Sequence, residues 1–186
     1  MAASLVRAAR FTGVSADGVH ALSRAYALAM KPRVATFEDD HHPLFLHPGR
    51  SVLVLLRDVS CVDGPLLCAA ALVESEDAEL RISGADIRAG LGGDVADLVQ
   101  AVPMPGTESL AEALVTADER VRLLALAERL DHLRHAHLRE ADEGWRAAAH
   151  AEARSIYWPV AERTHARLAQ RYEHWCRTFA RRLERA

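Results

Sequence analysis

The chain has 186 residues, half of them hydrophobic, and a formal net charge of −3 from 23 Lys and Arg against 26 Asp and Glu. This length predicts a single domain, residues 1–186, with a full hydrophobic core. The slight acidic excess argues against a protein that coats nucleic acid or a membrane surface. The longest apolar run, residues 66–73, is too short to span a bilayer. Cys61, Cys68 and Cys176 form no CxxC pair, which favours the reducing cytoplasm over a disulfide framework or zinc ribbon.

Helical spacing dominates the first half of the chain, and strand signals are almost absent. Ser15 predicts the N-cap of a helix that Pro32 ends. Residues 33–46 are expected to form a loop, and a second helix is expected to start at His47-Pro48. A strongly apolar stretch from Leu66 to about Ser75 predicts a helix that is buried on most sides.

The second half continues the helical pattern. Ser83 predicts the cap of a short helix, which Gly92-Gly93 separates from the next one. The longest periodic pattern predicts one helix over about 109–138. A last pair of helices is expected over about 142–154 and 159–184. Together these patterns predict an all-α single domain.

Four stretches carry a resemblance to a known family, and they occur in the family's order and spacing. They are His42-Pro43-Leu44-Phe45-Leu46-His47-Pro48, Ala69–Ser75, Ser83–Val99 and Val121–Arg134, followed by Ile156–Arg163. These resemble the hydrolase domain of the RelA/SpoT family, where the corresponding motifs include His-Pro, Ala-Ala-Leu-Leu-His-Asp and Leu-Ala-Asp-Arg-Leu-His-Asn. The resemblance covers about residues 20–170. It implies a helical HD-superfamily domain, of the type that removes pyrophosphate from (p)ppGpp with Mn²⁺.

The resemblance also implies which residues would hold the metal. In the family these are a His before Pro, the His-Asp pair and the Asp of Leu-Ala-Asp-Arg-Leu. The matching positions here are His47, Glu74-Ser75 and Glu128, so only the first keeps its residue type. One imidazole and two carboxylates still form a common ligand set for divalent metals, which makes His47, Glu74 and Glu128 the candidate ligands. The expected cofactor is Mn²⁺ or another divalent metal, or none.

The residues expected to act on a substrate also depart from the family. Its catalytic Glu-Asp falls on Ala78-Glu79 by direct spacing, while Glu76-Asp77 lies two residues earlier, so Glu79 and Asp77 are the candidate catalytic residues. Its Asn corresponds to His132, which together with Arg134 is a candidate for ligand binding. Its phosphate-contacting Arg-Lys falls near Glu38-Asp39, a charge reversal that would repel a polyphosphate.

The candidate ligands also have structural explanations. His47 could simply begin a helix beside Pro48. Glu74 and Glu128 could pair with arginines such as Arg129 or Arg134 at the ends or flanks of buried helices.

The remaining candidates have alternatives as well. The acidic residues 76–79 could form a solvated loop. Arg134 could contact a phosphate or form a salt bridge to Glu74 or Asp131. His132 and His135 lie three residues apart on one helix face, where they could bind Zn²⁺ or lie at the surface.

Three functional hypotheses follow. The leading one is a stand-alone (p)ppGpp-hydrolase-like HD domain, degenerate at its metal site, that no longer hydrolyses (p)ppGpp and binds a small nucleotide or a partner protein. The alternative is a metal-dependent phosphohydrolase with a rebuilt site that releases pyrophosphate from a (p)ppGpp-like nucleotide. The third is a helical interaction module without a ligand. No nucleic acid or membrane partner is expected, and the apolar face of the last helix, with Trp175 and Phe179, is either core or a homodimer face.

Overall fold

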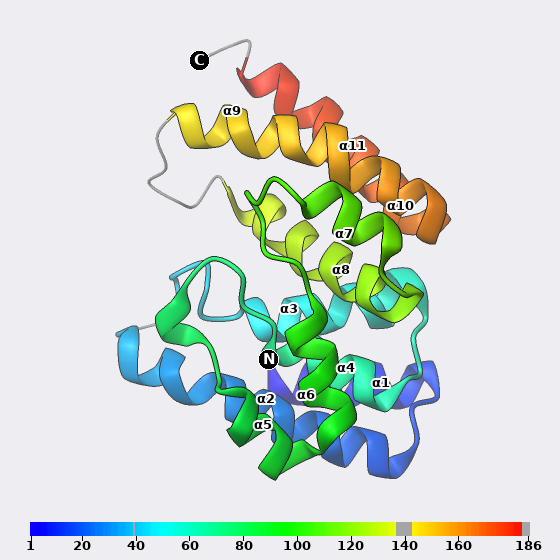
Figure 1. Cartoon of the computed structure of the whole chain (residues 1–186). Helices are drawn as coiled ribbons and strands as arrows, with labels where there is room; N and C mark the ends of the chain where they lie inside the picture. The colour runs from blue at the N-terminus through cyan, green and yellow to red at the C-terminus, as the bar shows by residue number, and fades with distance from the viewer. Residues whose placement is uncertain (39, 137–142, 184–186) are drawn as a thin grey trace.

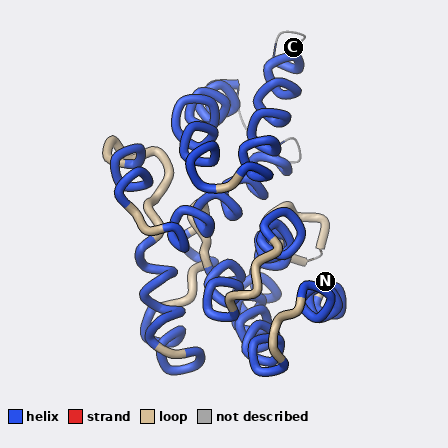
Figure 2. Tube along the Cα trace, turned by 90° about the vertical axis from the view of Figure 1, so that its right-hand side faces the viewer, coloured by secondary structure: helices blue, strands red, loops and turns tan. Residues whose placement is uncertain are grey.

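A computed structural model describes residues 1–38, 40–136 and 143–183, and within these ranges the chain forms helices and loops without a strand (Figures 1 and 2). The prediction of an all-α fold is confirmed. None of the described helices is long and apolar enough to cross a membrane. The α-helices are α1 (Ala2–Thr12), α2 (Ala16–Thr36), α3 (His47–Val54), α4 (Gly64–Leu72), α5 (Gly84–Leu91), α6 (Gly93–Ala101), α7 (Leu110–Thr116), α8 (Glu119–His135), α9 (Glu143–Glu152), α10 (Trp158–Thr164) and α11 (Ala166–Leu183).

Two helices organise the packing. Helix α4 contacts α2, α3, α6 and α8, while α8 contacts α3, α4 and α6 as well as α10 and α11. In Figure 1, α8 accordingly lies between the C-terminal helices α9–α11 above and the N-terminal helices below. One hydrophobic cluster extends from Leu5 in α1 to Cys176 in α11. The buried ends of α3 and α4 therefore meet the middle of α8 inside the core.

Helix α4 is the apolar helix that the sequence predicts, but it is shorter. Asp63 caps it by accepting the backbone N–H of Leu66 at 3.0 Å, and all residues from Leu66 to Leu72 are buried. The helix ends at Leu72, and Val73 has an extended backbone (φ −67°, ψ 128°). Beyond it, the Glu74 carboxylate accepts the backbone N–H groups of residues 76 and 77, a local turn that competes with helix continuation. Glu74 and Ser75 thus lie just outside the helix.

The prediction that Pro32 ends α2 is wrong. The helix continues to Thr36 with Pro32 inside it. A proline so close to a helix end removes a single backbone hydrogen bond. The last turn is held by Arg33, whose buried guanidinium donates to the backbone carbonyls of Ala29 at 2.9 Å and Leu44 at 3.0 Å.

Two long predicted helices are each divided in the structure. Asp118 interrupts the pattern over 109–138 by capping α8, its carboxylate accepting the N–H of Val121 at 2.9 Å; residues 137–138 lie outside the described ranges. The segment 159–184 is divided by His165, which has an extended backbone (φ −157°, ψ 120°). Neither break contains Gly or Pro, so the helical spacing of apolar residues continues across each break and gives no signal of it. Helix α1 has no counterpart among the predicted elements.

Two π-helical segments, η1 (Leu55–Val59) and η4 (Ala153–Tyr157), continue α3 and α9 directly. A short 3₁₀ turn, η2 (Ala78–Leu80), follows α4. Segment η1 brings Asp58 to the flank of α8 and α11, where it meets the arginines of both helices.

The fully buried Tyr172 ties α11 to α8 through a polar contact. Its hydroxyl donates to the carbonyl of Leu126 at 2.8 Å, and burial raises its pKa well above the usual value of 10.0, so the hydroxyl keeps its proton. We expect Tyr172→Phe to lower the free energy of unfolding by about 1 kcal/mol, measured by urea denaturation. Tyr26→Phe is the control, because the Tyr26 hydroxyl forms no hydrogen bond with a described residue. An equal loss of stability in both variants would contradict the prediction.

Candidate metal centre

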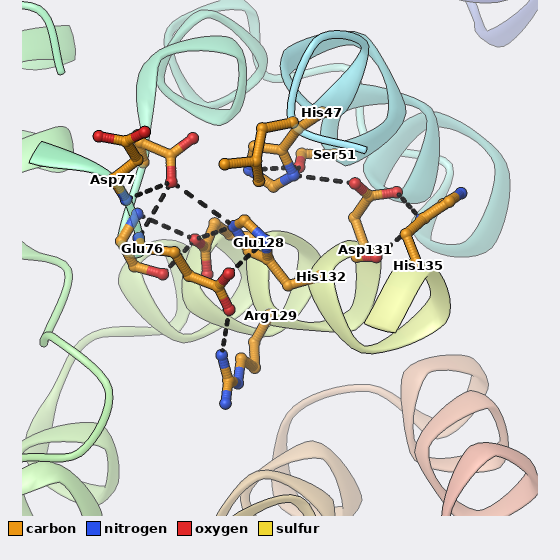
Figure 3. A network of polar contacts seen from close by, with 12 residues as sticks. His47, Ser51, Glu76, Asp77, Glu128, Arg129, Asp131, His132 and His135 are labelled. Atoms are coloured by element: carbon orange, nitrogen blue, oxygen red, sulfur yellow. Dashed lines mark hydrogen bonds and ion pairs between the residues drawn. The ribbon is translucent and has the colours of Figure 1, made fainter. Parts of the chain in front are cut away.

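Three segments that are distant in the sequence meet at one buried polar centre (Figure 3). The first residue of α3 supplies His47, the segment after α4 supplies Glu74 and Ser75, and the middle of α8 supplies Glu128 and His132. These residues are 0–9% exposed. Buried polar groups are costly unless they are paired, so the arrangement of their partners indicates what the centre can do.

His47 is oriented by Asp131. The His47 Nδ1 atom lies 2.8 Å from the Asp131 carboxylate, to which Arg50 also donates through Nε at 2.9 Å. Burial lowers the pKa of His47, and the neighbouring His132 lowers it further, although Asp131 opposes both effects. The ring therefore favours its neutral form, which is the form that binds metals. A carboxylate on one nitrogen of a histidine is the usual support of a metal-binding ring, whose other nitrogen faces the ion.

His132 also lies close to a carboxylate, without a well-directed hydrogen bond to its Oε2 atom. Its Nδ1 atom lies 3.3 Å from the Glu76 carboxylate, which accepts from Arg129 at 2.9 Å. The His132 ring stacks on His47 with 4.0 Å between the centroids. Its Nε2 atom lies 3.0 Å from Glu128 Oε1 and 3.8 Å from Glu74 Oε1, yet it is buried and forms no hydrogen bond of acceptable direction with any described residue.

Glu74 and Glu128 are held by different partners. Arg33 donates to Glu74 Oε2 at 2.6 Å, while Glu74 Oε1 accepts two backbone N–H groups, those of residues 76 and 77. Ser75 donates to Glu128 Oε1 through its hydroxyl at 2.5 Å and its backbone N–H at 3.2 Å. Ser75 therefore positions Glu128, which differs from the role of a ligand that its place in the sequence implied.

His47, Glu74 and His132 fit a divalent metal ion. One potential ligand atom from each lies within 4.8 Å of the other two. Two atoms bound to one ion at about 2.1 Å can be at most about 4.2 Å apart, so a small contraction of the cluster is sufficient. The buried Nε2 of His132 forms no well-directed hydrogen bond with a described residue, and two imidazoles with one carboxylate suit Mn²⁺, Fe²⁺ or Zn²⁺.

The charges around the centre also favour a cation. The described side chains here include four carboxylates, those of Glu74, Glu76, Glu128 and Asp131, which contact three guanidinium groups, those of Arg33, Arg50 and Arg129. With neutral imidazoles, this set carries one net negative charge. In a buried environment such a charge is unfavourable, and a cation would compensate it.

The structure brings together His47, Glu74, Glu128 and His132, but not the other predicted site residues. Asp77 is half-buried and accepts the backbone N–H of Glu79 at 2.9 Å, while the Glu79 side chain is exposed. Arg134 lies on the opposite flank of α8, 3.6 Å from Asp58, and His132 and Arg134 therefore share no pocket.

Several alternative pairings are corrected in the same way. Arg129 pairs with Glu76 at 2.9 Å and with Glu152 at 3.1 Å, instead of with Glu74 or Glu128. His135 contacts Asp131, so it does not join His132 in a zinc pair. Asp39, one of the three acidic residues at 38–40 expected to repel a polyphosphate, lies outside the described ranges.

Three residues of the centre, Arg33, Arg50 and Asp131, are not predicted from the sequence. Arg33 follows Pro32 in a segment expected to be a loop, and no local signal marks it as the partner of Glu74. Asp131 lies directly before His132 in the motif that resembles the RelA/SpoT family, but its contact with His47 joins residues 84 positions apart. Such a contact depends on how α3 crosses α8, which periodicity does not encode.

Comparison with known proteins supports the fold. No protein-family model matches the chain, and no curated protein matches it in sequence. A solved structure of a metazoan ortholog of SpoT, which hydrolyzes ppGpp and plays a role in starvation responses, is similar with a TM-score of 0.62. The match has 20% sequence identity and covers 88% of this chain and 96% of the other. The chain therefore has a fold similar to that of this SpoT ortholog, in agreement with the helical fold that the sequence resemblance implied.

Proposed function

We propose that this chain is a (p)ppGpp-hydrolase-like HD domain that keeps a divalent metal, in a centre rebuilt from His47, Glu74 and His132, and that has lost (p)ppGpp hydrolysis. The observation that carries the proposal is the convergence with Glu74 of two buried histidines, His47 with a carboxylate hydrogen-bonded to Nδ1 and His132 with one 3.3 Å from Nδ1. The protein would then act by binding a nucleotide or a partner.

The surroundings of the centre support the loss of hydrolysis. The exposed Glu79 is poorly placed to orient a water molecule inside the buried cluster, and Asp77 is engaged with the backbone of η2. The Ser75 hydroxyl is engaged with Glu128. A positioned general base assists hydrolysis of a phosphate ester, and neither Asp77 nor Glu79 is arranged for that task.

A pocket next to the centre favours a second candidate function, a phosphohydrolase with a rebuilt site. This pocket of about 340 Å³ is lined by Ser75, Glu76 and Arg129, together with Trp145 and Glu152. A bound divalent metal would supply Lewis-acid activation of a phosphate and of a water molecule. Arg129 is placed to bind a phosphate oxygen of a nucleotide, and Glu76, in contact with both Arg129 and His132, is placed to orient water.

Metal content decides whether the centre binds an ion. We expect about one divalent ion per chain after expression with added Mn²⁺ and purification without a chelator or a His tag, measured by mass spectrometry. His47→Ala and His132→Ala should each abolish binding. His20→Ala is the matched control, since His20 is exposed on α2, and it should retain the metal. A wild-type protein without metal would contradict the proposal.

A turnover assay then separates the two candidates. With Mn²⁺ bound, the first candidate function, a domain that has lost hydrolysis, predicts no release of pyrophosphate from ppGpp. Release that is abolished by His47→Ala and strongly reduced by Glu76→Gln, while Glu79→Gln has no effect, would establish the second candidate. Release of pyrophosphate that requires Glu79 would contradict both candidate functions, because neither gives Glu79 a role in hydrolysis.

A further inference from the structure

A basic groove lies on the flank of α8 beside Asp131, whose carboxylate also contacts His47 of the metal centre. It consists of two adjoining pockets, of about 250 Å³ and 320 Å³, which share the side chains of Arg134 and Arg171. The first is formed by α3, η1 and α8 with α11, and the second by α8 and α11. We use the name basic groove for this pair of pockets.

Asp58 at the floor of the groove is surrounded by more arginines than it can pair with. Arg171 donates to Asp58 Oδ1 through two nitrogens, at 2.8 Å and 3.0 Å. Arg134 and Arg167 approach the same carboxylate only to 3.6 Å and 3.7 Å, which is beyond hydrogen-bond distance. The Asp58 carboxylate thus lies near three guanidinium groups and accepts its hydrogen bonds from Arg171.

Two further arginines add to the excess. Arg50 lines the groove and is paired with Asp131 at its inner wall. Arg57 also lines it, is exposed, and forms no ion pair or hydrogen bond with any described residue. Among the described side chains, five guanidinium groups, including those of Arg134, Arg167 and Arg171, thus lie around the two carboxylates of Asp58 and Asp131.

This cluster of arginine side chains suits an anion with several oxygen atoms that can accept hydrogen bonds. Guanidinium groups bind phosphate through paired hydrogen bonds, and unlike charges reduce the repulsion among the arginines. The pocket of about 250 Å³ is large enough to hold a phosphate or pyrophosphate group. The neighbouring pocket has aromatic walls from Trp175 and Phe179, against which the organic part of a ligand can pack.

We propose that the basic groove binds a small phosphorylated molecule, whose phosphates contact Arg57, Arg134 and Arg171. The side chains of Arg134 and Arg171 are 34% and 40% exposed, so a ligand reaches them without opening the fold. This site is separate from the metal centre and holds whether or not the centre binds a metal.

Calorimetric titration with inorganic pyrophosphate tests the proposal. The full chain is used in low-salt buffer with EDTA, which removes any contribution of a metal at the other site. We expect saturable binding of pyrophosphate that weakens at least about tenfold in Arg57→Gln and in Arg171→Gln, because each loses a charge-assisted contact. Affinity should also fall as salt is added.

The control is Arg163→Gln. Arg163 is an exposed arginine on α10 that lines neither pocket, so this variant should bind pyrophosphate like the wild type. Arg57→Gln removes no ion pair or hydrogen bond with a described residue, and its melting curve should match the wild type. No binding by the wild type, equal weakening in Arg163→Gln, or binding of RNA or heparin without binding of pyrophosphate would each overturn the proposal. Arg57→Gln should retain the metal content of the wild type. Its loss of pyrophosphate binding then arises in the basic groove and not at the metal centre.

Discussion

Replacing Arg33 with methionine is expected to lower the free energy of unfolding by about 3–5 kcal/mol, as is typical when one partner of a buried ion pair is removed. Arg33 is 2% exposed, and its guanidinium donates to Glu74 at 2.6 Å and to two backbone carbonyls. Methionine fills much of the space but leaves the Glu74 carboxylate as an uncompensated buried charge. Urea denaturation of protein freed of metal with EDTA measures this loss.

Two further measurements define the cause of that loss. The exposed pair of Arg88 and Asp97 provides the control, and Arg88→Met should change stability by less than about 1 kcal/mol. The double variant Arg33→Met/Glu74→Gln should recover part of the loss, because the charge is then absent. Added Mn²⁺ should also stabilise Arg33→Met, since a cation at Glu74 would replace the missing guanidinium. A loss below about 1 kcal/mol in Arg33→Met would contradict this account.

The second large effect is a loss of stability in acid. Burial by itself raises the pKa of Glu128, but attraction to His132 and His47 and the hydrogen bond from Ser75 lower it from 4.5 to about 2. A carboxyl whose pKa is lower in the folded state stabilises the fold above the unfolded value, and this contribution disappears as the pH falls through the folded value. We therefore expect up to about 3 kcal/mol to be lost between pH 4.5 and pH 2 in the presence of EDTA.

Variants separate the contribution of Glu128 from general acid denaturation. Glu128→Gln should be less stable at neutral pH and should lose less stability between pH 4.5 and pH 2, since it has no proton to take up. Glu112→Gln changes an exposed carboxyl on α7 and should follow the wild-type curve. Asp131, whose pKa is lowered by His135, His47 and Arg50 against the effect of burial, adds a contribution of the same sign. If Glu128→Gln kept the full wild-type slope, Glu128 would not be the origin of the acid sensitivity.

Several expectations from the sequence concern properties that the fold does not test. The single domain over residues 1–186, a cytoplasmic location and a homodimer stay predictions. Trp175 and Phe179, expected on a core or dimer face, stack on each other at 4.6 Å beside the basic groove, and the Trp175 indole donates to the carbonyl of Leu133.

The sequence by itself determined the helical class and the position of most helices, because apolar spacing and caps such as Ser15 and Ser83 are local. It also identified His47, Glu74, Glu128 and His132, through a motif order that survives the changes of residue type. The tertiary structure alone decided which of them meet and what holds them. Arg33 contacts Glu74 across 41 positions and Asp131 contacts His47 across 84, and such pairings follow from how α2, α3 and α8 pack. Periodicity shows which face of a helix is buried, whereas the partner that it meets depends on the arrangement of the whole chain.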